Sequence, residues 1–118
     1  DVDPGLIAVF APRGIVLSGG PESVNAANSP RAPESVYSAG VPVLGICYGM
    51  QTMAAQLGGS VLSGLEREFG HAEVQVLGAD RLLGGLSDHY DRAALDVWMS
   101  HGDRVGELPP GFVVTAAT

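Results

Sequence analysis

The sequence VLGICYGMQ, residues 43–51, contains the only cysteine of the chain and marks a junction between two elements. An apolar, β-branched run over residues 41–46 precedes Cys47 and predicts a buried strand. Residues 48–57 then predict a helix that ends at the glycine pair behind it. The thiol of Cys47 therefore lies where a strand turns directly into a helix.

A cysteine at such a junction is either a small structural residue or a nucleophile, and free cysteine is more often buried and structural. Gly45 and Gly49 flank Cys47 symmetrically. Their missing side chains would leave room for a tight corner, as in the Gly-x-Ser-x-Gly elbow of hydrolases. A helix N-terminus also favours a negatively charged thiolate. The pattern favours a nucleophile, with a structural cysteine as the alternative.

A nucleophile that forms a tetrahedral intermediate needs hydrogen-bond donors for the oxyanion. The backbone N–H of Tyr48 is one candidate, because it follows Cys47 directly. A second candidate lies in the Ser-Gly-Gly-Pro turn at residues 18–21, which follows a predicted strand at 14–17. Functional turns gather at the carboxyl ends of strands in open α/β sheets, so we expect these two turns to lie side by side.

The pattern of apolar residues along the chain predicts an α/β fold. Helices predicted at residues 3–10 and 34–39 alternate with the two strands. Such alternation indicates a doubly wound, mostly parallel, flavodoxin-like sheet with helices on both faces. The C-terminal half predicts further short strands, some of them antiparallel, at residues 61–62, 72–77, 95–99 and 112–116.

The two ends of the sequence suggest an incomplete domain. A doubly wound sheet normally begins with a central strand, and none precedes Asp1. The chain stops at Thr118, directly after a predicted strand. We therefore expect residues 1–118 to be part of a larger domain.

Composition narrows the possible partners and compartments. The formal net charge is -7 and no run of Lys or Arg occurs, which argues against nucleic acid and anionic membranes as partners. No apolar run approaches the ~20 residues of a membrane-spanning helix. A single cysteine cannot form an intramolecular disulfide, so we expect a reducing cytoplasm.

Three segments, in order along the chain, resemble motifs of the class I (triad-type) glutamine amidotransferases. GICYGMQ at 45–51 resembles the nucleophile motif Gly-x-Cys-x-Gly-x-Gln of that family. LSGGPES at 17–23 resembles its oxyanion turn, and SHGD at 100–103 resembles its substrate-backbone loop. The segments NSPRAP, REFG and DVWMSHGD, which begin at residues 28, 67 and 96, are similar to the branch found in GMP synthases.

The resemblance implies a role for individual residues. Cys47 would attack the side-chain amide of glutamine and form a γ-glutamyl thioester with release of ammonia. The backbone N–H groups of Gly20 and Tyr48 would form the oxyanion hole. The residues implied in binding the substrate glutamine are Glu22, Gln51, Ser100, Gly102 and Asp103.

The resemblance also implies partners. Ammonia would pass to an ATP-pyrophosphatase (synthetase) domain of the same enzyme, which aminates xanthosine monophosphate to GMP in purine biosynthesis. It implies no cofactor and no metal within these residues, because ATP and Mg belong to the synthetase domain. The full-length protein would be a homodimer.

One part of the family pattern is missing. The general base of the family is the His of a His-Pro-Glu segment, and this sequence contains no such segment. We therefore expect residues 1–118 to be inactive alone. His71 and His89 are interpreted as solvated or hydrogen-bonded, and His101 as part of the SHGD motif. Another Cys-elbow enzyme, such as a γ-glutamyl hydrolase, or a non-catalytic remnant of the fold remain alternatives.

Two other groups of residues have structural interpretations. Trp98 and Met99 lie on a predicted strand, where we expect them in the core. Asp88, Asp91 and Asp96 lack the spacing of a metal site, and we expect them to form a solvated loop.

Overall fold

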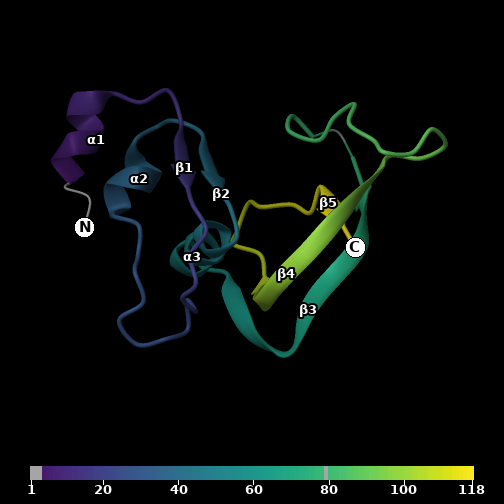
Figure 1. Cartoon of the computed structure of the whole chain (residues 1–118). Helices are drawn as coiled ribbons and strands as arrows, with labels where there is room; N and C mark the ends of the chain where they lie inside the picture. Colours follow the sequence, from purple (N-terminus) through teal and green to yellow (C-terminus); the bar gives the residue numbers. More distant parts are fainter. Residues whose placement is uncertain (1–3, 79) are drawn as a thin grey trace. The chain divides into compact units, whose positions relative to one another are not determined.

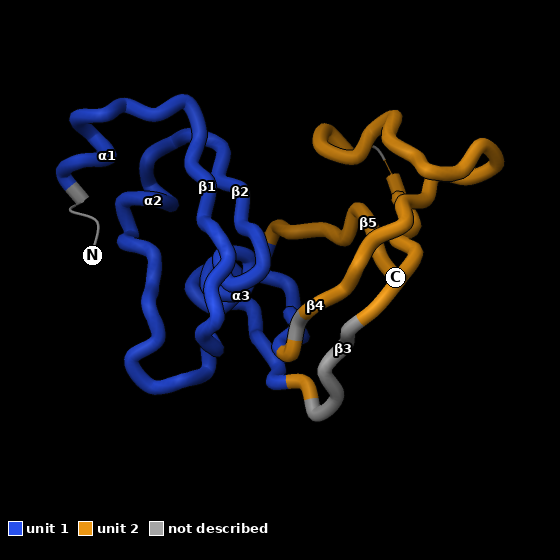
Figure 2. Tube along the Cα trace, in the orientation of Figure 1, with its two compact units in different colours: residues 1–63, 103–110 blue, residues 64–102, 111–118 orange. Residues whose placement is uncertain are grey.

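The computed structural model describes residues 4–78 and 80–118, except for the side chains of residues 4, 65–69 and 101 (Figure 1). The side chains of most of the REFG segment and of His101 therefore lie outside the described residues. The chain divides into two compact units (Figure 2). The first unit comprises residues 1–63 and 103–110, and the second comprises residues 64–102 and 111–118.

The first unit contains the helices and strands that the N-terminal half of the sequence predicts, in the predicted order and with slightly shorter bounds. Helix α1 packs against α2, and α3 packs against both strands. The elements are α1 Pro4–Phe10, β1 Ile15–Leu17, α2 Glu34–Ser38, β2 Val43–Gly45 and α3 Tyr48–Gln56.

Strands β1 and β2 run parallel, as the sequence predicts. Ile15 pairs with Val43, and Leu17 pairs with Gly45. The carboxyl ends of the two strands therefore lie next to each other. This places the turn after β1 beside the junction between β2 and α3.

Glycines end the helices of the first unit where the sequence predicts. Gly40 after α2 has φ 70°, and Gly58 after α3 has φ 95°, the left-handed region that favours glycine. The N–H of Gly59 donates to the carbonyl oxygen of Ala54 at 2.9 Å, which closes the last turn of α3.

The C-terminal half forms a sheet with the strand order β4-β3-β5. Strand β5 is antiparallel to β3, with Gln75 opposite Ala117. The bounds are β3 Ser60–Val76, β4 Ala94–Glu107 and β5 Ala116–Ala117.

Strands form at residues 61–62, 72–76 and 95–99 as predicted, but three details of the predicted sheet are wrong. The strands predicted at 61–62 and 72–77 are parts of the single strand β3. The strand predicted at 95–99 extends to Glu107, so the SHGD segment belongs to β4 and is not a loop. The strand predicted at 112–116 is reduced to β5, because backbone pairing begins only where the N–H of Leu77 donates to the carbonyl oxygen of Thr115.

The prediction that Trp98 lies in the core is also wrong. The Trp98 side chain is 76% exposed. Successive side chains of a strand point to opposite faces. Asp96, Trp98 and Ser100 share the exposed face of β4, whereas Val97 and Met99 are partly buried.

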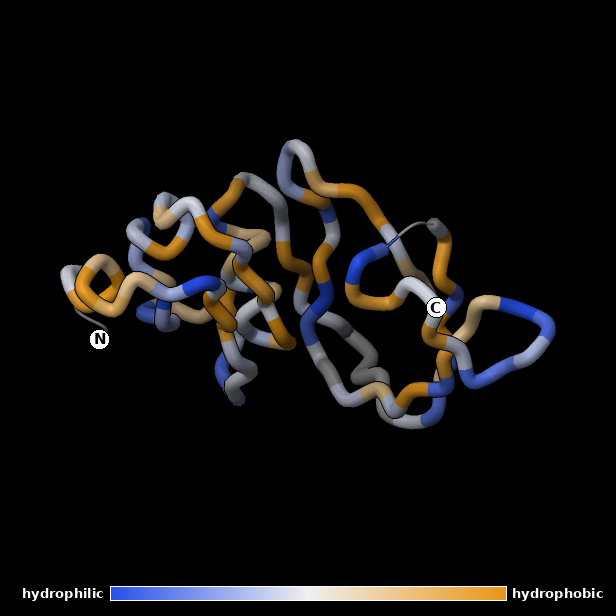
Figure 3. The backbone as a smooth tube through the Cα atoms, turned by 90° about the horizontal axis from the view of Figure 1, so that it is seen from above, coloured by the Kyte–Doolittle hydropathy of each residue, from blue (hydrophilic) through white to orange (hydrophobic). Residues whose placement is uncertain are grey.

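Apolar and polar residues alternate along much of the backbone (Figure 3). Few of the side chains that the structure describes are fully buried; Val24, in the turn after β1, is 1% exposed. Exposed apolar side chains are common, among them Val16 on β1 and Leu44 on β2. Among the described residues, no helix is long and apolar enough to cross a membrane.

Candidate active site

Cys47 occupies the corner between β2 and α3. It is the N-cap residue of α3, with φ 53° and ψ -115°, and its side chain is exposed. A positive φ is uncommon for a residue with a side chain and indicates a strained turn. The structure thus confirms the predicted elbow, with an accessible thiol at a helix N-terminus.

The glycines beside Cys47 are required by backbone packing. A Cβ built on Gly45 would lie 2.7 Å from the Cα of Met50 and 2.8 Å from its nitrogen. Real side chains do not approach backbone atoms this closely. Gly49 has a similarly close neighbour in the backbone of Leu17. Glycine is therefore required at positions 45 and 49, because a side chain at either one would collide with backbone atoms.

The turn after β1 lies against the elbow, as predicted. A Cβ built on Gly19 would lie 3.3 Å from the Cβ of Cys47 and 3.9 Å from its Sγ. One built on Gly20 would lie 3.8 Å from the Cβ of Tyr48. Within the described part of the chain, the backbone N–H groups of Gly20 and Tyr48 donate no hydrogen bond. Gly20 follows the glycine that contacts Cys47, and Tyr48 follows Cys47 directly, so two available donors lie in the segments that meet at the elbow. Their use as an oxyanion hole stays a prediction.

Tyr48 is held in place from two sides. Its side chain is 8% exposed, and its hydroxyl donates to the carbonyl oxygen of Pro30 at 2.5 Å. The N–H of Ile46, two residues before Tyr48, donates to the carbonyl oxygen of Leu17 at 2.9 Å. The start of α3 is thereby fixed to β1 and to the loop before α2.

Two of the predicted substrate-binding residues contact each other. Gln51 is 5% exposed, and its side-chain Nε2 donates to the backbone oxygen of Asp103 at 3.0 Å. Glu22 is exposed in the turn after β1. Ser100 and Gly102 lie in β4 within the second unit. Contact of all these residues with glutamine stays a prediction.

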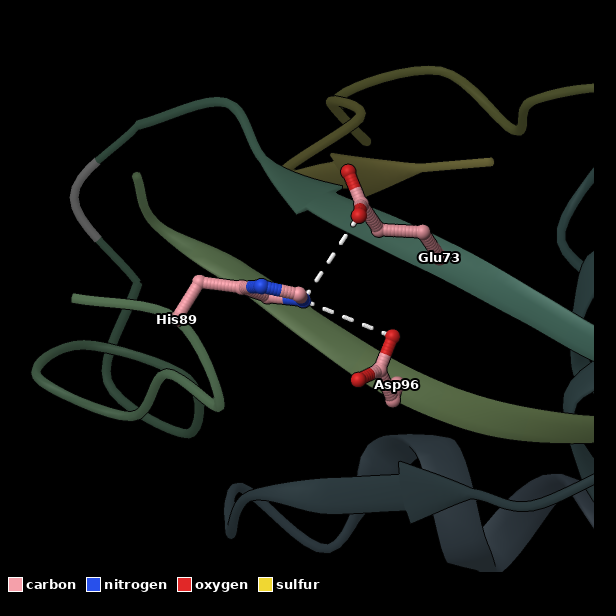
Figure 4. Close-up of side chains that lie close together, drawn as sticks. All are labelled: Glu73, His89 and Asp96. Atoms are coloured by element: carbon pink, nitrogen blue, oxygen red, sulfur yellow. Dashed lines mark ion pairs between the residues drawn. The ribbon is translucent and has the colours of Figure 1, made fainter. Parts of the chain in front are cut away.

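A second group of charged residues lies within the second unit: Glu73, His89 and Asp96, here called the Glu73 cluster (Figure 4). The Nε2 of His89 lies 3.5 Å from Glu73 Oε2 and 3.4 Å from Asp96 Oδ1. His71 approaches the same Asp96 oxygen at 3.3 Å. Asp96 belongs to β4, so the prediction that it lies in a solvated loop is wrong.

Arg92 binds the carboxylate of Glu73 in the Glu73 cluster. Its Nε donates to Glu73 Oε1 at 3.2 Å, and its Nη2 donates to Oε2 at 2.6 Å. These hydrogen bonds lower the pKa of Glu73 and raise the pKa of Arg92. With both Glu73 oxygens bound to a guanidinium, the cluster is a network of ion pairs. That the residues of the Glu73 cluster bind no metal stays a prediction.

Comparison with known proteins identifies the family. The sequence profile described as "Glutamine amidotransferase class-I" matches residues 4–118. The chain belongs to the class-I glutamine amidotransferases. Solved structures support the predicted α/β fold. A GMP synthase subunit from Thermoplasma acidophilum has a TM-score of 0.70 at 30% identity, and the match covers 98% of this chain and 56% of that chain.

A glutamine amidotransferase from Thermotoga maritima has a TM-score of 0.66 at 28% identity, covering 83% of this chain and 44% of that one. Two relatives are named "GMP synthase [glutamine-hydrolyzing]". The one from Alcanivorax borkumensis is 63% identical over 114 residues, which is 95% of this chain. The one from Xanthomonas campestris is 58% identical over 118 residues, which is 100% of this chain. The chain spans only 22% and 23% of these relatives' lengths.

One contact near the predicted site does not follow from the sequence patterns. Ser23, at the end of the quoted LSGGPES segment, donates its hydroxyl to the carboxylate of Asp103. The two residues are 80 positions apart, and no sequence pattern connects them. The contact depends on the tertiary fold.

Proposed function

We propose that these residues form the glutamine-hydrolysing site of a GMP synthase. The observation that carries the proposal is the position of Cys47, on a strained elbow and in contact with the turn that contains Gly19 and Gly20. The relatives named GMP synthase support the choice of this branch of the family.

The proposed reaction begins with attack of the Cys47 sulfur on the side-chain amide carbon of glutamine. The amide oxygen becomes negatively charged, and the N–H groups of Gly20 and Tyr48 stabilise it. The proton of the thiol passes to a histidine outside these residues. As the intermediate collapses, the carbon–nitrogen bond breaks, and the departing NH2 group takes that proton and leaves as ammonia. Water then cleaves the thioester, releasing glutamate and restoring the thiol.

The proposal extends to the rest of the enzyme. Ammonia would pass to a synthetase domain that uses ATP and Mg to convert xanthosine monophosphate to GMP. The full-length protein would act as a homodimer. A catalytic thiol must stay reduced, which fits a cytoplasmic enzyme.

The test separates the two half-reactions in the full-length protein. Cys47→Ala should abolish ammonia release from glutamine and leave GMP synthesis from free ammonium at the wild-type rate, because the thiol serves only hydrolysis. Met53→Leu is the matched control on the same helix and should retain both activities. Glutamine hydrolysis by Cys47→Ala at the wild-type rate would refute the proposal.

A further inference from the structure

Ser23 connects the turn after β1 to strand β4. Its hydroxyl donates to Oδ2 of Asp103, and both side chains are partly buried. Among the described residues, no other group donates to this carboxylate. The second carboxylate oxygen, Oδ1, is therefore left to accept a hydrogen bond from elsewhere.

The Ser23 hydroxyl is oriented by its own loop. The backbone N–H of Asn25 donates to Ser23 Oγ at 3.3 Å, so the hydroxyl proton is directed to Asp103. The side chain of Asn25 donates to the carbonyl oxygen of Val61 at 3.0 Å. Val24, between Ser23 and Asn25, is 1% exposed and fixes the loop to the core. A donor held this firmly restricts the rotation of the carboxylate that it binds.

Asp103 is also attached to the nucleophile helix. The Gln51 side chain donates to its backbone oxygen at 3.0 Å, and the Gln51 N–H donates to the carbonyl oxygen of Cys47 at 3.1 Å. Asp103 is thus tied to α3, the helix that Cys47 caps, and to the turn that contains Gly20. Ser23 holds the carboxylate itself, and Gln51 holds the backbone of the same residue.

We propose that Ser23 is a positioning residue that orients the Asp103 carboxylate toward the α-ammonium group of the substrate. The inference rests on the proposed glutamine hydrolysis. The hydroxyl holds Oδ2, and Oδ1 accepts from the ammonium in a charge-assisted hydrogen bond. Ser23 never contacts the substrate. It determines which amides bind, favouring those with a free α-amino group.

The first test is steady-state hydrolysis by the full-length protein. Ser23→Ala should raise KM for glutamine about tenfold and leave kcat within about twofold, since the lost contact orients a binding group. Ser23→Thr and Ser23→Val have nearly the same shape and differ in the hydroxyl. The threonine variant should keep KM near the wild-type value, and the valine variant should show the Ser23→Ala defect.

The second test uses glutaric acid monoamide, which lacks only the α-amino group of glutamine. Wild-type protein should hydrolyse it with a higher KM than glutamine. Ser23→Ala should change that KM by less than about twofold, because no ammonium is present for the carboxylate to bind. A merely structural role for Ser23 would affect both substrates equally. The rate of Cys47 alkylation by iodoacetamide should be the same in wild type and Ser23→Ala.

The outcomes separate this inference from the proposed function. Wild-type protein that releases no ammonia from glutamine would overturn both. An active wild type combined with an unchanged glutamine KM in Ser23→Ala and Ser23→Val would overturn only the role of Ser23. Equal losses with glutamine and glutaric acid monoamide would also overturn it. A loss restricted to glutamine, and restored by threonine, supports it.

Discussion

A Cβ built on Gly49 would lie 2.0 Å from the carbonyl oxygen of Leu17. That oxygen already accepts a hydrogen bond from the N–H of Ile46 at 2.9 Å. The end of β1 and the first turn of α3 therefore meet backbone to backbone. Any side chain at residue 49 must push the strand away from the helix and break the geometry on which the elbow depends.

Gly49→Ala should destabilise the protein by roughly 2–3 kcal/mol, the upper range for overpacking a tight site. It should also abolish glutamine hydrolysis, because the turn between β2 and α3 could no longer hold Cys47 in its present conformation. Gly14→Ala is the control, since its Cβ would lie at an ordinary 3.5 Å from the carbonyl oxygen of Pro42. Urea denaturation of the full-length protein measures both variants. A Gly49→Ala protein as stable as the control would contradict the close contact.

The positive φ of Cys47 predicts that a side chain at this position lowers the stability of the protein. Its φ of 53° and ψ of -115° favour glycine over any residue with a Cβ. Cys47→Gly should therefore be more stable than Cys47→Ala by about 1 kcal/mol, although neither can hydrolyse glutamine. Thermal and urea denaturation of the two variants make the comparison. Equal stability would show that the corner holds no strain at this residue.

The sequence predicts the elbow well because local constraints determine it. A run of apolar residues predicts the strand, and the helix follows it directly. Gly45 and Gly49 allow the close backbone contacts of the turn between them. The same is true of the helix ends at Gly40 and Gly58. Each feature depends on residues a few positions apart, which is the range over which sequence patterns carry information.

The errors concern features that depend on tertiary pairing. The apolar run at 112–116 has the composition of a strand, but only its end meets β3. Trp98 is large and apolar, yet the pleat of β4 places it on the exposed face. The contact between Ser23 and Asp103 joins two segments of the chain that no local pattern relates. The composition of a segment indicates which secondary structure it favours, but the tertiary fold determines which residues it contacts.

The ion pair between Glu73 and Arg92 predicts a stability that depends on pH. The Arg92 hydrogen bonds lower the pKa of Glu73 below its usual value of 4.5. A carboxylate with a lowered folded pKa stabilises the protein above its unfolded pKa, and this contribution disappears as the pH falls through the folded pKa. The wild type should therefore exceed Glu73→Gln in stability at neutral pH, and the difference should vanish in acid below the lowered pKa.

Urea midpoints measured from about pH 7 down to about pH 3 give this comparison. Glu107→Gln is the control, because Glu107 is exposed and forms no ion pair with the described residues. The loss of stability at low pH should be specific to the ion pair of Glu73 with Arg92. A Glu73→Gln difference that does not change with pH would show that Arg92 does not stabilise the ionised carboxylate.

Two features of the first unit bear on how residues 1–118 behave alone. Val16 and Leu44 are paired across β1 and β2, and both are exposed, at 61% and 38%. Ile46, close to them in the fold, is 50% exposed. The first unit also contains no histidine in its sequence, so it supplies no imidazole base for Cys47.

Residues 1–118 expressed alone should therefore bind a hydrophobic dye and release no ammonia from glutamine above a Cys47→Ala control. The exposed apolar face attracts the dye or a second copy of the chain. General acid–base assistance contributes about 10²–10⁴-fold, so hydrolysis without it should be undetectable. Dye fluorescence should fall in a Val16→Thr, Leu44→Thr double variant, which removes apolar surface from that face. Turnover by a monodisperse 118-residue chain would place the base within these residues, with His101 the first histidine to replace.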